Sequence, residues 1–307
     1  MRFLASMVMR GRSQAVMWAA ALAMLSLVFP LISILSSAVV ALVTLRRGPR
    51  EGALLMVLAG AACTILAYLA LNQAVLAAGF VLVMWFPIWL LAVVLRASRS
   101  MAMALQAGLV LGLLAIVWQF LQHDDPVAAW SEMLQPIISS MVESQMLDQA
   151  HEQDFLSLMS YWAARLVGFG FFLQTWVSLL VGRWWQAVLY NPGGFRSEFH
   201  QLRLNRVLAI VTVVLMLPNL LGGESSWTFL DSIVWLLLAG WFLAGLAAVH
   251  GVVGLIGGNI FWLIGVYMLL LITMIHTMMV LATVAVFDTW FDFRARLRSR
   301  IGSGRAD

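Results

Sequence analysis

The chain has 307 residues, of which 63% are hydrophobic and only 10% are charged. Soluble domains contain about 45–50% apolar and about 25% charged residues, so this composition excludes an ordinary soluble protein. The formal net charge is +4, and every basic residue is an arginine. Because these arginines lie at the ends of apolar segments, they indicate membrane topology and exclude a nucleic-acid partner. The single cysteine, Cys63, excludes an intramolecular disulfide and a cysteine-based metal site.

Apolar runs recur along most of the chain. A helix needs about 20 apolar residues to cross a membrane, and the runs lack the strict alternation of barrel strands. The sequence therefore predicts an all-α, polytopic transmembrane bundle of about eight to nine spans. The predicted segments are 15–29, 31–45, 53–71, 80–95, 103–121, 158–182, 207–221, 229–249 and 260–287. The first two are short and separated by Pro30, which predicts a tight helical hairpin or one kinked element.

We expect four parts along the chain. Residues 1–182 form a six-segment bundle, and 183–206 form an arginine-rich loop. Residues 207–293 hold the C-terminal spans, and 294–307 form a basic tail.

Arginine-rich segments set the expected orientation, because positively charged loops stay in the cytoplasm. The turns at 46–50 and 96–99, the loop 183–206 and the tail are all arginine-rich. We therefore expect a bacterial inner-membrane protein with both termini in the cytoplasm. Three spans after Arg206 would instead leave the tail outside. Either one C-terminal segment does not cross fully, or the glycine-rich stretch 250–258 contains an extra turn.

Residues 123–154 differ from the rest of the chain, since they carry seven acidic residues and no arginine. This charge places them outside the cytoplasm. Apolar side chains recur there at every fourth position: Leu134, Ile138, Val142 and Met146. The spacing predicts an amphipathic, extracytoplasmic helix over 131–154, with Pro136 near its first turn. This helix either covers the ends of the spans or closes a binding cavity as a lid.

The loop 183–206 contains the most distinctive local motif. We interpret its residues as a cytoplasmic loop motif: Asn191, Pro192, Gly193, Gly194, Phe195, Arg196, Glu198 and Arg203. Further along, the glycines in 250–258 do not follow a strand, so they predict close helix packing or a kink and not a dinucleotide site.

Four polar residues in or near the spans are candidate ligand-binding residues: Arg165, Gln174, Gln106 and Asn72. An arginine inside a span is costly and indicates an anion site or an ion pair, although near a helix end its side chain can reach the interface. The amides either join helices by hydrogen bonds or line a cavity for a neutral polar solute.

Catalytic and cofactor motifs are missing from the sequence, including a nucleophile elbow, HExxH and a phosphate-binding loop. We therefore expect no enzyme activity, no cofactor and no metal. At the end of the last segment, Asp292 and Arg296 stand at the i,i+4 spacing of a helical ion pair.

Three stretches resemble the YybS-like family of bacterial multi-pass membrane proteins. They are 45–48 with Gly52, 191–199 with 202–204, and 287–294. The first six segments also resemble the S components of energy-coupling-factor transporters. That resemblance implies a six-helix fold with a solute cavity open to the outside, which the helix at 131–154 would cap.

Two functions follow as expectations. The first is a solute-binding membrane subunit of a transport system, whose ATPase partner would be a separate chain. The alternative is a membrane scaffold or assembly factor that docks protein partners through the loop 183–206. In both cases the lipid bilayer is a partner; a small-molecule solute belongs to the first, and a membrane or cytoplasmic protein to both.

Overall fold

The protein is entirely helical in the part that the structure describes. The computed structural model describes residues 2–72, 75–220 and 228–303, and these contain no β-strand. This confirms the predicted all-α class; the last four residues of the predicted tail, 304–307, lie outside the described part.

In chain order the helices are α1 (Arg2–Met9), α2 (Arg12–Leu25), α3 (Ile32–Arg47), α4 (Pro49–Leu71), α5 (Val75–Phe80), α6 (Phe86–Ser98), α7 (Met101–Gln122), α8 (Pro126–Glu143), α9 (Glu152–Tyr190), α10 (Gly194–His200), α11 (Arg206–Leu220), α12 (Thr228–Leu255), α13 (Phe261–Ile272), α14 (Met274–Phe291) and α15 (Phe293–Ser303). A π-helical turn, η1 (Val81–Trp85), joins α5 to α6, and a 3₁₀ turn, η2 (Gln149–His151), precedes α9.

Six of the described helical segments are long and apolar enough to cross a membrane. They are Pro49–Leu69, Ala78–Ser98, Met101–Gln122, Gln149–Tyr190, Thr228–Leu255 and Met274–Phe291. Two shorter apolar segments accompany them, Arg206–Pro218 and Phe261–Ile272. These lengths and compositions indicate a membrane-embedded protein.

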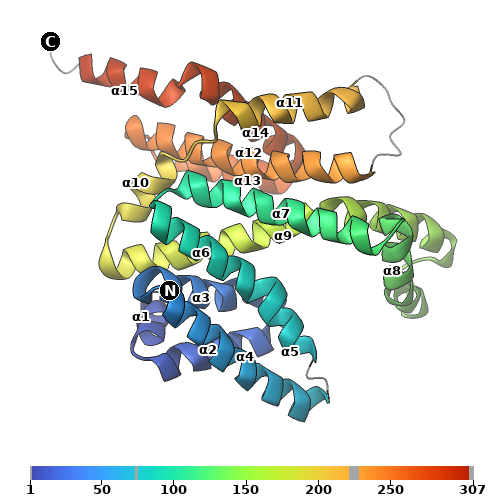
Figure 1. The fold of residues 1–307 in the computed structure, drawn as a ribbon. Coiled ribbons are helices and arrows are strands. Elements are labelled where there is room, and N and C mark those ends of the chain that lie inside the picture. The colour runs from blue at the N-terminus through green and yellow to red at the C-terminus, as the bar shows by residue number, and fades with distance from the viewer. Residues whose placement is uncertain (1, 73–74, 221–227, 304–307) are drawn as a thin grey trace.

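The helices form a layered bundle with α9 and α12 at its centre (Figure 1). The N-terminal helices pack on one side of α9 through α3, and α14 packs on α12 at the other side. Helices α1, α10 and α15 lie at one end of the bundle, and α8 lies at the opposite end (Figure 1). We call the first end the arginine end, because Arg46, Arg96, Arg183 and Arg203 lie there.

The first two segments form a hairpin. The hydroxyl of Ser36 in α3 donates to the carbonyl oxygen of Ala19 in α2 at 2.8 Å, and it accepts a 3.0 Å bond from the indole of Trp85. A kinked single element could not bring Ala19 and Ser36 together. Pro30 lies in the turn between the two helices, so of the two predicted forms the hairpin is confirmed.

The predicted amphipathic helix exists, but its bounds were wrong. It begins at Pro126 and ends at Glu143, so Met146 lies beyond it. The side chain of Asp125 caps its start by accepting bonds from the amides of Val127 and Ala128, and proline is well suited to the first helical position. Pro136 therefore lies inside the helix and not in its first turn.

The predicted last span, 260–287, is wrong as a single segment, because the chain breaks at Thr273 (φ −130°, ψ 52°) between α13 and α14. A Cβ on Gly245 of α12 would overlap the Leu281 carbonyl of α14, and one on Gly251 would touch Arg294 of α15. Positions along α12 and α14 thus advance in the same direction.

Two parallel helices need a returning segment between them, and α13 provides it. Its twelve residues rise only about 18 Å, which is less than a full crossing. With this extra segment, α15 returns to the arginine end beside the loop 183–206. Of the two expected explanations, the short α13 agrees with a C-terminal segment that does not cross fully, and the additional turn lies at Thr273 and not in the glycine-rich stretch.

The close approach of α12 and α14 depends on Gly245. We predict that Gly245→Ala lowers the stability of the protein by roughly 1–3 kcal/mol, because the added methyl group forces the two backbones apart. The measurement is the unfolding midpoint of the detergent-purified protein.

Gly265→Ala in α13 is the matched control, since a Cβ there meets nothing within 4 Å. It should keep or slightly raise stability, because alanine favours a helix over glycine. Equal midpoints for the two variants would contradict the proposed backbone contact.

Candidate functional site

The loop between α9 and α11 folds tightly at its glycines. Pro192 disfavours a helical conformation for Asn191, which ends α9 with φ −150° and ψ 71°. Gly193 follows in the left-handed region (φ +88°), and the Gly194 amide donates to the Asn191 carbonyl at 3.0 Å. The short helix α10 starts there and packs against α12 and α9. Phe195 stacks on Phe199 along this helix.

Ion pairs bind this loop to the rest of the arginine end. Arg183 of α9 donates to both carboxylate oxygens of Glu198 in α10, from Nη2 and from Nε, and the distance from Nε to Oε2 is 2.9 Å. Arg203 likewise donates to both carboxylate oxygens of Asp292, with its Nη1 2.6 Å from Oδ2. Its Nε lies 3.3 Å from the carboxylate of Asp288. Three residues of the loop motif therefore stabilise the loop itself: Glu198 and Arg203 through ion pairs, and Gly193 through the tight turn.

Arg294 of α15 belongs to the same group of ion pairs as Arg203, because both bind Asp288. Its side chain is buried, and the residue is only 4% exposed. It donates to Asp288 at 2.7 Å, to the His200 carbonyl at 2.7 Å and to the Leu202 carbonyl at 3.0 Å. Burial lowers the pKa of Arg294 below its usual value, although Asp288 opposes this effect. The α15 helix is thus tied to α10 through backbone atoms.

The predicted pair of Asp292 and Arg296 is wrong. Asp292 ends α14 with a left-handed backbone (φ 45°), and its carboxylate binds Arg203 and the amide of Ala295. Those bonds with Arg203 hold the pKa of Asp292 well below its usual range. Arg296 instead faces the ring of Phe291.

A basic hollow of about 460 Å³ lies between α10, α12 and α15. Arg196, His200, Arg294 and Arg298 contribute its positive groups. Among the residues that the structure describes, neither Arg196 nor Arg298 forms an ion pair with a carboxylate. Gly254 makes room for His200 and Arg196, because a Cβ on this residue would lie 2.8 Å from the His200 ring and 3.5 Å from the Arg196 side chain.

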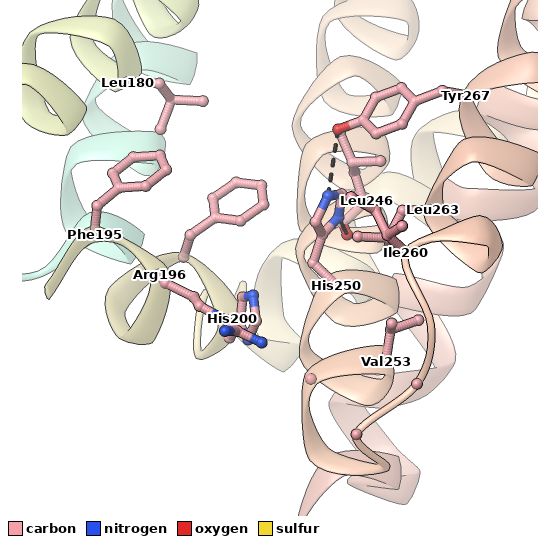
Figure 2. A pocket seen from close by; sticks show the side chains of 14 residues that line it. Leu180, Phe195, Arg196, His200, Leu246, His250, Val253, Ile260, Leu263 and Tyr267 are labelled. Carbon is pink, nitrogen blue, oxygen red and sulfur yellow. Dashed lines mark hydrogen bonds between the residues drawn. The ribbon is translucent and has the colours of Figure 1, made fainter. Parts of the chain in front are cut away.

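A second hollow of about 710 Å³ continues from the first, and Arg196, His200 and Gly254 line both. Figure 2 shows Arg196 and His200 on one wall and His250 and Tyr267 on the other. The His250 Nδ1 lies 2.8 Å from the Leu246 carbonyl, which can only accept, so Nδ1 carries a proton. The His250 Nε2 then lies 3.3 Å from the Tyr267 hydroxyl.

His200 is the titratable group between the unpaired arginines and His250. Burial lowers its pKa below the usual value, and the positive charges of Arg196, His250 and Arg294 lower it further. Its imidazole is therefore mainly neutral at neutral pH. An anion bound beside it would raise this pKa and favour the cation.

A third hollow, of about 550 Å³, is almost entirely apolar and meets the second at Tyr267. It runs between α9, α12, α13 and α14, and its far end is lined by Trp162 and Trp235. The three hollows thus adjoin one another in series through shared lining residues, from the arginine end to the apolar part of the bundle. We call this series the basic-apolar groove.

The structure does not bring the four candidate ligand residues together. Arg165 pairs with Asp231 of α12 at 3.2 Å and lies over the Tyr161 ring at 3.4 Å. Gln174 donates to Ser33 of α3 at 3.0 Å. These two residues join helices.

The other two candidates lie at opposite ends of the bundle. Gln106 accepts a weak 3.4 Å bond from Asn205 near the arginine end, whereas Asn72 ends α4 in a left-handed conformation (φ 54°). The buried amide that joins three helices is Gln119, which donates to the Ala164 carbonyl at 2.9 Å and accepts from Trp130 at 3.1 Å.

Sequence reasoning missed His200, His250, Tyr267 and Arg298 as one group. The sequence contains no clear signal for this group, since its members are spread from α10 to α15 and no motif links them. Their partner glycine, Gly254, was noticed only as part of a packing stretch.

Comparison with known proteins gives no match: no family model, no curated protein and no solved structure is significantly similar to this chain. The resemblances to the YybS-like family and to transporter S components remain predictions. The function has to be argued from the geometry of the groove.

The pair of Arg165 and Asp231 gives a direct test of a structural role. We predict that Arg165→Met lowers stability by about 3–5 kcal/mol, because it removes the guanidinium group that pairs with the buried carboxylate of Asp231. The unfolding midpoint and the denaturant dependence of tryptophan fluorescence measure this loss.

The double variant Arg165→Met/Asp231→Asn serves as the control, since it removes both charges. It should be more stable than Arg165→Met alone. A double variant as unstable as the sum of the single variants would mean that the two side chains do not interact.

Proposed function

We propose that this chain is a ligand-binding membrane subunit of a transport system, and that it binds an anionic ligand in the basic-apolar groove. The observation that carries the proposal is the division among the arginines. Arg183, Arg203 and Arg294 are neutralised by carboxylates of the chain, whereas Arg196 and Arg298 line the groove and pair with no carboxylate of the described residues. A ligand anion would supply the missing negative charge.

The groove also has the mixed lining that is typical of ligand sites. Small-molecule sites are concave, largely apolar and supplied with a few convergent polar groups. Here Arg196, His200 and His250 converge from two helices on a hollow whose other walls are aliphatic and aromatic. Energy for transport would come from a partner protein, since the sequence contains no nucleotide-binding motif.

The proposed orientation places the arginine end in the cytoplasm of a bacterium, with the chain in the inner membrane. The positive-inside rule supports it, because the turns and the loop at this end carry arginine while α8 and its flanks carry acidic residues. A cytoplasmic ligand would then reach the groove directly. None of the three hollows is lined by α8, so we propose α8 as a cover of the helix ends and not as a lid.

The alternative is a membrane scaffold or assembly factor that docks partners at the arginine end. The exposed basic face of α15, including Arg296 and Arg298, favours it. The loop 183–206 favours it less, because Arg183 and Arg203 are already engaged within the chain. The groove gives a more specific observation, and we therefore place ligand binding first.

Ligand binding is tested on the detergent-purified full-length protein by native mass spectrometry and by thermal shift with a panel of soluble and lipidic anions. We expect a bound anion or a raised unfolding midpoint for the wild type. Arg196→Gln/Arg298→Gln should lose most of this effect, because it removes the two groove charges that pair with no carboxylate in the described part of the chain.

Arg50→Gln is the matched control, since Arg50 is an exposed arginine of the same end that does not line the groove. It should bind like the wild type. An empty wild-type protein that no anion stabilises would disprove the binding proposal and leave the scaffold alternative.

Orientation is tested by labelling single cysteines in a Cys63→Ala background with a membrane-impermeant maleimide. We expect Ser140→Cys in α8 to react in cells with an intact inner membrane. Ser197→Cys in α10 and Ser299→Cys in α15 should react only after the inner membrane is permeabilised, because both lie at the arginine end. Labelling of Ser299→Cys together with Ser140→Cys would contradict the topology.

A further inference from the structure

The basic-apolar groove is polar at one end only, and this asymmetry bears on its ligand. The hollow at the arginine end carries Arg196, His200 and Arg298, whereas the hollow between α9 and α13 offers almost no polar surface. A small soluble anion would use the first part and leave the second without an occupant. A molecule with an anionic head and a hydrocarbon tail would fill both.

The chemistry of the polar end favours a phosphate. Arginine side chains bind phosphate oxygens through several parallel hydrogen bonds, and basic pockets between membrane helices on the cytoplasmic side bind phosphate headgroups of lipids. Arg196 and Arg298 approach this hollow from different helices, and the imidazole of His200 stands between α10 and Gly254. A headgroup there could accept bonds from all three side chains.

The length of the groove limits the tail. Nineteen residues of α12 separate Gly254 at the polar end from Trp235 at the apolar end, which corresponds to about 28 Å. The hydrocarbon core of a bilayer is about 30 Å thick, so one leaflet supplies about half of it. A tail confined to one leaflet would therefore reach only about half of the way from Gly254 to Trp235, and a tail that fills the groove must be longer than one leaflet.

We infer that the basic-apolar groove binds a monophosphorylated lipid with a single long hydrocarbon tail, of the polyprenyl phosphate class. The phosphate lies between Arg196, His200 and Arg298. The tail passes Tyr267 and ends between Trp162 and Trp235. This inference rests on the proposed anion-binding function and adds the class of ligand.

Tyr267 stands where the two larger hollows meet, and its hydroxyl is held by His250. Its hydroxyl points toward His250 in the second hollow (Figure 2), and the same side chain also lines the apolar hollow. Aromatic residues with one polar tip are suited to such a boundary between polar and apolar surroundings. The tyrosine would thus mark the level at which the head ends and the tail begins.

The test compares four probes on the full-length protein in phosphatidylcholine nanodiscs, with apparent dissociation constants from native mass spectrometry. The probes are a long-chain polyprenyl monophosphate, farnesyl monophosphate, the long-chain polyprenol without phosphate, and inorganic phosphate. We expect the long-chain phosphate to bind at least about tenfold more tightly than each of the other three, since only it uses both parts of the groove.

Two variants separate the head from the tail. Arg196→Gln/Arg298→Gln should weaken both lipid phosphates by roughly tenfold or more. Leu270→Trp fills the apolar hollow and should weaken only the long-chain phosphate, to about the affinity of farnesyl monophosphate. Leu269→Trp is its matched control, because Leu269 is the exposed neighbour that does not line the hollow.

A photoreactive group at the distal end of the tail provides an independent readout. Cross-links near Trp162 or Trp235 would support the inference, and cross-links spread over the outer surface would show an annular lipid only. Equal affinity for long and short phosphates, or no effect of Leu270→Trp, would overturn the tail assignment while the anion site stands. Binding of no probe, together with no binding in the soluble panel, would overturn both proposals.

Discussion

The buried carboxylate of Asp288 is the constraint on which the arginine end depends. It is 3% exposed, and a buried charge is strongly unfavourable unless it is paired and hydrogen-bonded. Arg294 and Arg203 satisfy it from α15 and from the loop after α10. Because Arg294 also donates to the His200 carbonyl, the same cluster fixes the position of α10 on α12. The walls of the groove are therefore set by a structural ion cluster at its edge, since Arg294 belongs to the cluster and also lines the basic hollow.

Glycine on α12 makes this arrangement sterically possible. A Cβ on Gly251 would lie 2.8 Å from the His200 carbonyl, and one on Gly254 would meet the His200 ring. The short helix α10 can thus lie directly on the α12 backbone, with its polar side chains turned toward the hollow. The glycine-rich stretch was interpreted from the sequence as close packing or a kink. It does serve packing, and Gly257 (φ +62°) then ends the helix and turns the chain toward α13.

Local signals in the sequence predicted local structure well, and they failed where contacts are distant. Composition gave the helical membrane class, and Pro30 marked the first hairpin. Asp125 and Pro126 are a helix-start signal that the sequence contains, but the apolar spacing from Leu134 to Met146 favoured a later start for α8. The break at Thr273 has neither proline nor glycine beside it, so no local rule places it. Arg165 and Asp231 lie 66 residues apart, and a single sequence gives no reason to pair them.

The same limit explains why the sequence does not distinguish among the arginines of the loop 183–206. In the sequence every arginine of the loop has equal weight, because charge neutralisation is a property of the folded chain. Only the structure separates Arg183 and Arg203, whose charges are balanced by carboxylates, from Arg196, which pairs with no carboxylate among residues 2–72, 75–220 and 228–303. A charge left unbalanced beside a long apolar hollow attracts its counterion from outside the chain. In a membrane, the anions that also carry hydrocarbon are lipids, and the fold thus favours a ligand that the bilayer itself can deliver.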